Sequence, residues 1–463
     1  MTAPQDPAKR LFAALMKWGP SSSSELCNYL NTPSSTLQRL LKSVSEAEPS
    51  PLLNVGKSRA RRYALKRPVD GLPAPTPIYE GAPDGSFTQI MTLQPVEPQG
   101  YYLHSELPDL SSGFLHTDPR YIGPNPFSDL PWFLENLRPE GFLGRAWVSD
   151  YKKNSPSAAR VSFPSDLQRW SGEDILRFTH LYGSDNSGSL VIGAPMLRYL
   201  QYHSPPSIPA HKRAQIFPQR AAEALSSAPY GSSPGGEQPK FSLAIDHHPA
   251  IIKFSPPMST PSGRRWADLL YSEYIVSEVL RRRNIPASAS ELLDSEDRRF
   301  LQVRRFDRSW TGARTGRRGM CSLFSFDRDG AGRELRSWRV ITEPLIGHGL
   351  TPEDHAHVCW LESLGHLIAN SDMHPGNLSL FLNGTQISGV APVYDMLPMA
   401  FAPSRAGEIP NEAVDPRAHQ GEFMPSVCEV ALEIWDEILR GDLSPSYRRL
   451  AEAQRDSVRS ISG

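Results

Sequence analysis

Two carboxylates and an amide follow one another closely towards the C-terminal end of the chain. Asp372 stands five residues before Asn377, and Asp395 follows an apolar strand pattern that turns at Asn383-Gly384. Phosphoryl transfer needs a carboxylate beside the acceptor hydroxyl and oxygen ligands that hold Mg²⁺ on the phosphates. The spacing therefore predicts Asp372 as the general base and Asn377 and Asp395 as Mg²⁺ ligands, with ATP as the phosphate donor.

A lysine lies inside an apolar stretch that is typical of a buried strand. Lys253 has isoleucine and phenylalanine neighbours, and a buried ammonium group needs an anionic partner to stay charged. Such a lysine can bind nucleotide phosphates while it pairs with a glutamate of the following helix. We expect Glu273 to be this partner, with Glu278 as the alternative. The competing interpretation is an exposed lysine on an edge strand.

A loop of small residues precedes this strand and reads GSSPGGEQPK from Gly231. Glycines let the backbone approach a nucleotide, so that N–H groups can point at phosphate oxygens. The spacing of a Walker A loop is absent. An ordinary surface loop is the alternative to the predicted phosphate-binding loop, which consists of Gly235, Gly236, Glu237, Gln238, Pro239 and Lys240.

A second strand pattern ends in the arginine-rich sequence RRFDR. We expect a hinge here whose backbone forms hydrogen bonds with adenine, formed by Arg304, Arg305 and Phe306. The stretch from Trp310 to Arg339 is also rich in arginine and is expected to be an inserted surface loop.

Residues 1–68 predict a winged helix-turn-helix that binds DNA. Three amphipathic helix patterns are followed by a hairpin with Gly56 at its tip. Residues 1–67 hold eleven Lys and Arg against four Asp and Glu, whereas the whole chain has a net charge of −1. A three-helix cap with a solvated basic face is the alternative. The expected DNA contacts lie on the third helix and in the hairpin: Gln38, Arg39, Lys42, Lys57, Arg59, Arg61 and Arg62.

The rest of the chain predicts an α/β protein of several domains, since 463 residues exceed one ordinary core. A proline-rich linker is expected over 69–80, a β-rich region with a kinase N-lobe over 81–300, and a C-lobe over 301–450. No apolar run is long enough to span a membrane. The cysteines are scattered singly, which argues against zinc or disulfides and favours the cytoplasm.

In this order the motifs resemble the HipA family of bacterial serine/threonine kinases, over roughly residues 80–440. The R-F-D-R signature is complete from Arg305, although Arg304 replaces the usual glutamate before it, and Pro392 to Asp395 match P-x-Y-D. The other matches are Ser233, Gly236 and Lys240 to S-x-x-G-x-x-x-K, and Asn370, Asp372, His374 and Asn377 to N-x-D-x-H-x-x-N.

This resemblance implies a two-lobed kinase-like fold that binds ATP and Mg²⁺, with His374 and Tyr394 beside the nucleotide. It implies transfer of the γ-phosphate to a translation protein, such as an aminoacyl-tRNA synthetase, and inactivating autophosphorylation at Ser233, with Ser232 as the fallback. HipA toxins normally pair with a separate helix-turn-helix antitoxin. Because this chain carries its own predicted DNA-binding module, the sequence does not decide whether a separate antitoxin exists or the fused module replaces it. A regulator that senses nucleotide and a small-molecule phosphotransferase remain alternatives.

Overall fold

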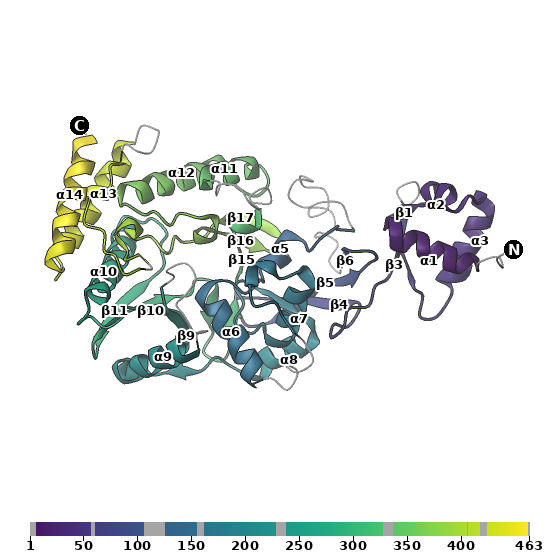
Figure 1. Cartoon of the computed structure of the whole chain (residues 1–463), viewed down its shortest axis with the longest axis horizontal. Helices are drawn as coiled ribbons and strands as arrows, with labels where there is room; N and C mark the ends of the chain where they lie inside the picture. The colour runs from purple at the N-terminus through teal and green to yellow at the C-terminus, as the bar shows by residue number, and fades with distance from the viewer. Residues whose placement is uncertain are drawn as a thin grey trace.

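The computed structural model describes residues 6–56, 61–105, 126–154, 162–227, 238–326, 337–404, 406–416 and 424–461. These residues form a mixed α/β structure, as predicted. Figure 1 shows the first three helices as a lobe at one end of the molecule, with the two C-terminal helices at the opposite end.

The N-terminal lobe has its own small hydrophobic core, built around Leu11, Leu26, Leu37 and Leu41. A capping box between Ser22 and Glu25 begins its second helix. The elements follow the predicted order, and the strands form a sheet in the order β1-β3-β2. They are α1 (Pro7–Trp18), β1 (Ser21–Ser22), α2 (Ser23–Leu30), α3 (Ser34–Ser45), β2 (Leu52–Val55) and β3 (Arg62–Leu65).

The linker predicted over 69–80 is shorter than expected, because β4 (Thr76–Gly81) already belongs to a sheet. Pro77 lies in this strand and has no N–H group to donate. The neighbouring strand β7 pairs only with Ile78 to Glu80, so the pairing of β4 with β7 loses no hydrogen bond at Pro77. The lobe is also not merely tethered. Arg67 donates its backbone N–H to Pro95 and forms an ion pair with Glu173 of the next region.

The middle region is a four-stranded sheet, in the order β6-β5-β4-β7, with helices packed on it. Its aromatic residues supply much of the core that it shares with the C-terminal part of the chain. Besides β4, its elements are β5 (Phe87–Pro95), β6 (Tyr101–Ser105), β7 (Leu190–Ile192), α5 (Trp132–Glu135), α6 (Gly141–Asn154), α7 (Gly172–Tyr182) and α8 (Gly193–Tyr202).

A five-stranded sheet follows, in the order β11-β12-β10-β9-β8. Helix α9 (Arg213–Ser227) packs on it through a phenylalanine-rich core, and α10 (Pro261–Arg282) follows its central strand. We predicted that the kinase N-lobe ends at residue 300 and the C-lobe begins at residue 301, but strand β12 of this sheet continues across that boundary. Its strands are β8 (Ser207–Ile208), β9 (Lys240–Ile245), β10 (His248–Phe254), β11 (Ser290–Ser295) and β12 (Arg298–Arg304).

The C-terminal region combines a three-stranded sheet, β15-β16-β17, with a set of helices, the last of which extends beyond the predicted end at 450. Among the described residues, no helix is both long and apolar enough to cross a membrane. The elements are β13 (Arg308–Trp310), β14 (Thr315–Arg317), β15 (Gly319–Ser322), α11 (Trp338–Thr342), α12 (Pro352–Leu367), β16 (Ser379–Asn383), β17 (Gln386–Val390), α13 (Pro425–Leu439) and α14 (Pro445–Ile461).

The arginine-rich stretch is not simply a surface loop. Its described part forms β14 and β15, and β15 pairs with β16 beside the predicted catalytic loop. Arg317 is only 3% exposed. The prediction of a surface loop was wrong for Arg317. Carbonyl groups of Ser184, Asn186 and Gly188 accept hydrogen bonds from its guanidinium group, which can therefore be buried.

Candidate active site

A cavity of about 670 Å³ lies between the middle region, the five-stranded sheet and the C-terminal region. The glycine-loop residues Ser232, Ser233, Gly235, Gly236 and Glu237 lie outside the described residues. The predicted residues that line the cavity are Gln238, Lys240, Lys253, Arg304, Arg305, Phe306, Asp372, His374, Asn377, Tyr394 and Asp395.

Lys253 is buried at the centre of the five-stranded sheet and contacts two carboxylates. Its Nζ lies 2.5 Å from Oε1 of Glu273 and also donates to Asp395. Burial alone would lower the pKa of Lys253, but these carboxylates raise it, so the ammonium stays charged. The alternative partner, Glu278, instead pairs with Arg281 on the surface of α10.

Helix α10, which carries Glu273, is fastened to the C-terminal helices. The Ser444 hydroxyl lies 2.6 Å from a carboxylate oxygen of Asp268, and Ser272 and Tyr447 share a hydrogen bond of 2.7 Å. Buried apolar residues of α10 pack into the same core. The position of Glu273 is therefore set by tertiary packing, which holds the ion pair with Lys253 in place.

The loop that carries Asp372 is fixed by two amide side chains. Asn370 accepts the backbone N–H of Asp372 at 3.1 Å, and Asn377 donates its side-chain N–H to the Asp372 carbonyl at 2.7 Å. The Asp372 carboxylate itself is half exposed, with His374 Nε2 3.9 Å away. The loop thus presents a carboxylate that is free to approach an acceptor hydroxyl.

His374 and Tyr394 help to hold the same loop. The His374 Nδ1 accepts from Gly376 at 3.0 Å, while Trp338 donates to the His374 carbonyl. The Tyr394 hydroxyl donates to the Gly376 carbonyl at 2.8 Å. Burial raises the pKa of Tyr394, which keeps the phenol neutral and able to donate. Both residues therefore have a positioning role besides any contact with a nucleotide.

Asp395 has an uncommon backbone conformation next to the cavity. Its φ of 54° is in the left-handed region, which few residues other than glycine adopt, although aspartate adopts it more often than most. Burial would raise the pKa of this carboxyl, but Lys253 and Lys240 lower it to about 2. Asp395 is therefore ionised and lines the cavity beside Lys253.

The oxygen atoms at this end suit Mg²⁺. Asn377 uses its amide nitrogen in the loop, and its oxygen has no partner among the described residues. Across the described part of the chain, no group of three His, Cys, Asp or Glu side chains is placed to hold a metal. Mg²⁺ binds through one or two carboxylates together with substrate phosphates and water, so Asp395 and Asn377 fit this chemistry.

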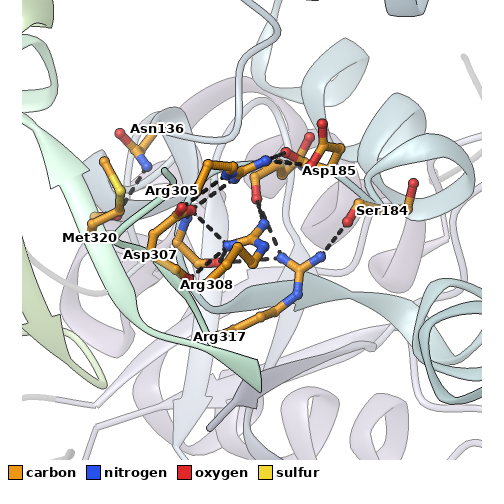
Figure 2. A network of polar contacts seen from close by, with 10 residues as sticks. Asn136, Ser184, Asp185, Arg305, Asp307, Arg308, Arg317 and Met320 are labelled. Carbon is orange, nitrogen blue, oxygen red and sulfur yellow. Dashed lines mark hydrogen bonds and ion pairs between the residues drawn. The ribbon is translucent and has the colours of Figure 1, made fainter. Parts of the chain in front are cut away.

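The backbone N–H groups of Arg304 and Arg305 in the predicted hinge donate to the carbonyls of Ala289 and Pro249, so these two groups cannot donate to a base. All three predicted hinge residues, Arg304, Arg305 and Phe306, line the cavity. The Arg305 guanidinium is buried and donates to Asp307 at 2.9 and 2.8 Å (Figure 2). The R-F-D-R signature thus contributes a buried ion-pair network to the cavity wall.

Part of the cavity wall was not predicted. It comes from the middle region, between Asn136 and Trp147 and in the turn Asp185–Ser187. The residues Asp185, Asn186 and Ser187 are typical of a turn, but the sequence does not indicate that this turn contacts the RRFDR segment. The cluster of arginines in the RRFDR segment was the available signal, because buried guanidinium groups require acceptors.

The basic surface of the N-terminal lobe is partly as expected. Gln38, Arg39 and Lys42 are exposed on α3, and Arg61 is exposed in the hairpin. Arg62 instead donates to the Pro20 carbonyl at 2.9 Å. Lys57 and Arg59 lie outside the described residues.

Comparisons with known proteins fit this arrangement. Residues 72–201 match the family described as YjjJ-like toxin, middle domain, and residues 232–444 match HipA-like C-terminal domain. Toxin YjjJ of Escherichia coli (strain K12) is 31% identical over 463 positions, which cover 96% of this chain and 97% of that protein. The chain belongs to the YjjJ family of HipA-like toxins. The two matched segments of this YjjJ-family chain are the parts that meet at the cavity.

A solved structure supports the fold of the YjjJ-family chain. A chain in the Shewanella oneidensis MR-1 toxin–antitoxin complex of HipA, HipB and operator DNA aligns with a TM-score of 0.56 and 16% identity. The alignment covers 83% of this chain and 96% of that chain. At 16% identity this likeness establishes a common fold and nothing about the chemistry of the cavity.

Proposed function

We propose that this chain is a Mg²⁺- and ATP-dependent serine/threonine protein kinase that acts as a toxin in the cytoplasm. The observation that carries the proposal is the contact of Lys253 with both Glu273 and Asp395, on the wall of the cavity that Asp372 and Asn377 also line. Protein kinases use a buried lysine paired with a helix glutamate, together with an aspartate that binds the metal, for phosphoryl transfer.

Each residue has a role that follows from its surroundings. Lys253 and Lys240 bind the phosphates, while Asp395 and Asn377 hold Mg²⁺, which would offset the negative charge of the phosphates when bound. Asp372, half exposed on a fixed loop, orients the acceptor hydroxyl and takes its proton. The exposure of this carboxylate suits an acceptor that belongs to another protein.

The proposed substrate class is a translation protein, such as an aminoacyl-tRNA synthetase, with phosphate transferred to serine or threonine. The resemblance to HipA supports this choice. Incubation of the pure protein with labelled ATP and a cell lysate tests it, with Asp372→Ala as the inactive control. Labelled protein bands that require Asp372 support a protein kinase. Label confined to small molecules would indicate a small-molecule phosphotransferase, and no label would indicate a nucleotide sensor.

Self-inactivation is a further part of the proposal. Ser233 precedes Lys240 in a segment whose spacing matches the family's autophosphorylated loop. A phosphate there adds about −1.5 to −2 charges near the nucleotide phosphates, and like-charge repulsion would exclude ATP. We expect activity to fall as phosphate accumulates on Ser233, or on Ser232, measured by intact mass and peptide mapping during incubation with ATP. Loss of activity without phosphate on either serine contradicts this.

DNA binding by residues 1–68 is a second function that we propose for the same chain. Exposed Gln38, Arg39 and Lys42 on α3, beside a basic hairpin, support it. The HipA structure that shares the fold is a complex with HipB and operator DNA. The fused lobe would place DNA binding in the toxin chain itself, with or without a separate antitoxin.

A further inference from the structure

A cysteine and a histidine lie one turn apart on α12, the helix that leads into the loop of Asp372. The Cys359 Sγ is 3.5 Å from Nε2 of His355. Both residues are partly exposed, and α11 packs beside this helix (Figure 1). Neither residue lines the cavity. A thiol outside the proposed active site therefore has a base within reach.

The tautomer of His355 follows from the partner of its other ring nitrogen. Nδ1 lies 3.0 Å from the hydroxyl of Thr342, and this hydroxyl donates its single hydrogen to the Trp338 carbonyl at 2.9 Å. The Thr342 oxygen therefore accepts a hydrogen bond from Nδ1–H. In a neutral imidazole this leaves the lone pair on Nε2, the atom that faces Cys359. His355 is thus oriented to accept the thiol proton.

The groups around Cys359 favour the protonated thiol. Burial raises the pKa of Cys359, and the carboxylates of Glu362 and Glu343 raise it further. The guanidinium of Arg339 lowers this pKa without reversing the shift. A protonated thiol is a poor nucleophile, because the thiolate is the reactive form. Cys359 therefore needs a base that removes its proton during the reaction, and Nε2 of His355 is placed to do so.

We propose that Cys359 is a site of reversible modification by small disulfides, with His355 as the proton acceptor. The Cys359 proton moves to Nε2 of His355 while Sγ attacks one sulfur of the disulfide. The new S–S bond forms as the old one breaks, and the departing thiolate takes the proton from His355. Cys359 is oxidised and one half of the small disulfide is reduced to a thiol, so the reaction needs no other oxidant.

A group attached to Cys359 would disturb the catalytic loop through α11. Glu362, on the next turn of α12, accepts the backbone N–H of Trp338 at 2.8 Å and forms an ion pair with Arg339. The indole N–H of Trp338 in turn donates to the His374 carbonyl in the catalytic loop at 3.0 Å. A bulky, negatively charged group would compete with Glu362 for Arg339 and loosen this connection. Modification therefore lowers phosphoryl transfer, a consequence that rests on the proposed function.

Oxidised glutathione, a small and negatively charged disulfide, tests the site on the intact chain. Cys27 is the internal control, because it is also partly exposed but its thiol has no hydrogen-bond partner among the described residues. Peptide mapping by mass should find the first mixed disulfide on Cys359. His355→Gln, which cannot take the proton, should slow the reaction at Cys359 about tenfold or more and leave the rate at Cys27 unchanged. First modification at Cys27, or an unchanged rate at Cys359 in a His355→Gln variant with normal thermal unfolding, would overturn the site.

Phosphoryl transfer and amide hydrogen exchange test the effect on the catalytic loop. The modified chain should transfer phosphate about 10- to 100-fold more slowly, because misplaced catalytic groups lose their alignment. The amides of Gly376 and Asn377 should exchange faster, while those of β16 stay unchanged. A thiol reductant should reverse both effects. Cys359→Ser should keep its activity in oxidised glutathione, whereas the matched Cys27→Ser should still lose activity.

The outcomes separate this inference from the proposed function. Modification of Cys359 that changes neither phosphoryl transfer nor amide exchange in the loop would overturn the link to α11. If the untreated chain transfers no phosphate, the proposed function fails. In that case the mass of the Cys359 peptide and the amide exchange of the loop still decide whether the thiol reacts and whether the loop responds.

Discussion

Two clusters of buried charges lie on the wall of the same cavity, and they are balanced in opposite ways. In the first, Lys253 contacts Glu273 and Asp395, so carboxylates outnumber cations, and Oε2 of Glu273 has no partner in the described part of the chain. In the second, Arg305, Arg308 and Arg317 outnumber the carboxylates of Asp185 and Asp307, and backbone carbonyls accept further N–H groups.

We infer from this difference that the first cluster forms a ligand-binding site, whereas the second cluster is a scaffold that stabilises the fold. In the first cluster two carboxylates share one buried lysine beside the cavity, where a divalent cation and phosphates could be bound. The second has its surplus guanidinium groups satisfied by carbonyls of the middle region, so it joins two segments that are distant in the sequence. Perturbing the first should impair ligand binding, whereas perturbing the second should impair stability.

The largest expected effect comes from a residue that belongs to neither cluster. Asp372→Ala should lower phosphoryl transfer about 10²- to 10⁴-fold, because a positioned general base is removed. The unfolding temperature and ATP affinity should stay close to those of the unmodified chain, since the carboxylate is half exposed. Initial rates with labelled ATP measure the effect, and Asp70→Ala on the exposed linker is the control. Full activity in Asp372→Ala would show that another residue is the base.

Breaking the second cluster should cost stability. Asp307→Ala leaves Arg305, Arg308 and the Gly188 N–H without their buried acceptor, and we expect a loss of about 3–5 kcal/mol in the free energy of unfolding. Denaturant unfolding measures it. Asp294→Ala removes the exposed partner of Arg299 and should cost at most about 1 kcal/mol. Similar values for the two variants would contradict the assignment of Asp307 to a scaffold.

Breaking the first cluster should weaken ligand binding. Asp395→Ala removes a Mg²⁺ ligand, so we expect ATP affinity in Mg²⁺ to fall more than about tenfold, which is about 1.4 kcal/mol. Lys253 keeps Glu273 as a partner, so the protein should remain folded. Titration with and without Mg²⁺ measures the difference, and ATP affinity that is equally Mg²⁺-dependent in the variant would exclude the metal role.

The N-terminal lobe should show the smallest and most salt-sensitive effect, because Arg61 and Arg62 are exposed. Replacing Arg59, Arg61 and Arg62 by alanine should reduce the log–log salt dependence of DNA binding by about one unit for each phosphate that these arginines neutralise. Arg62→Ala alone is a useful comparison, since this side chain bonds with the Pro20 carbonyl. A triple variant with an unchanged slope would show that the hairpin does not bind phosphates.

The sequence by itself determined the local elements and the order of the chemical groups. The amphipathic period predicted the helices of the first lobe, Gly56 indicated its hairpin, and the apolar strand around Lys253 predicted that this lysine needs a carboxylate partner. Local spacing also placed Asp372 and Asn377 in one loop, because a short loop limits how far its residues can separate. These features depend on neighbours in the chain, which a single sequence displays.

Tertiary structure alone decided which distant groups meet. Glu273 and Glu278 both follow Lys253 in one helix, and only the packing of α10 on the C-terminal helices selects Glu273. The Arg317 guanidinium was expected on a surface, yet carbonyls more than a hundred positions away bury and satisfy it. The free energy of a buried charge depends on all groups around it in space, and the spacing of residues along the chain does not specify them.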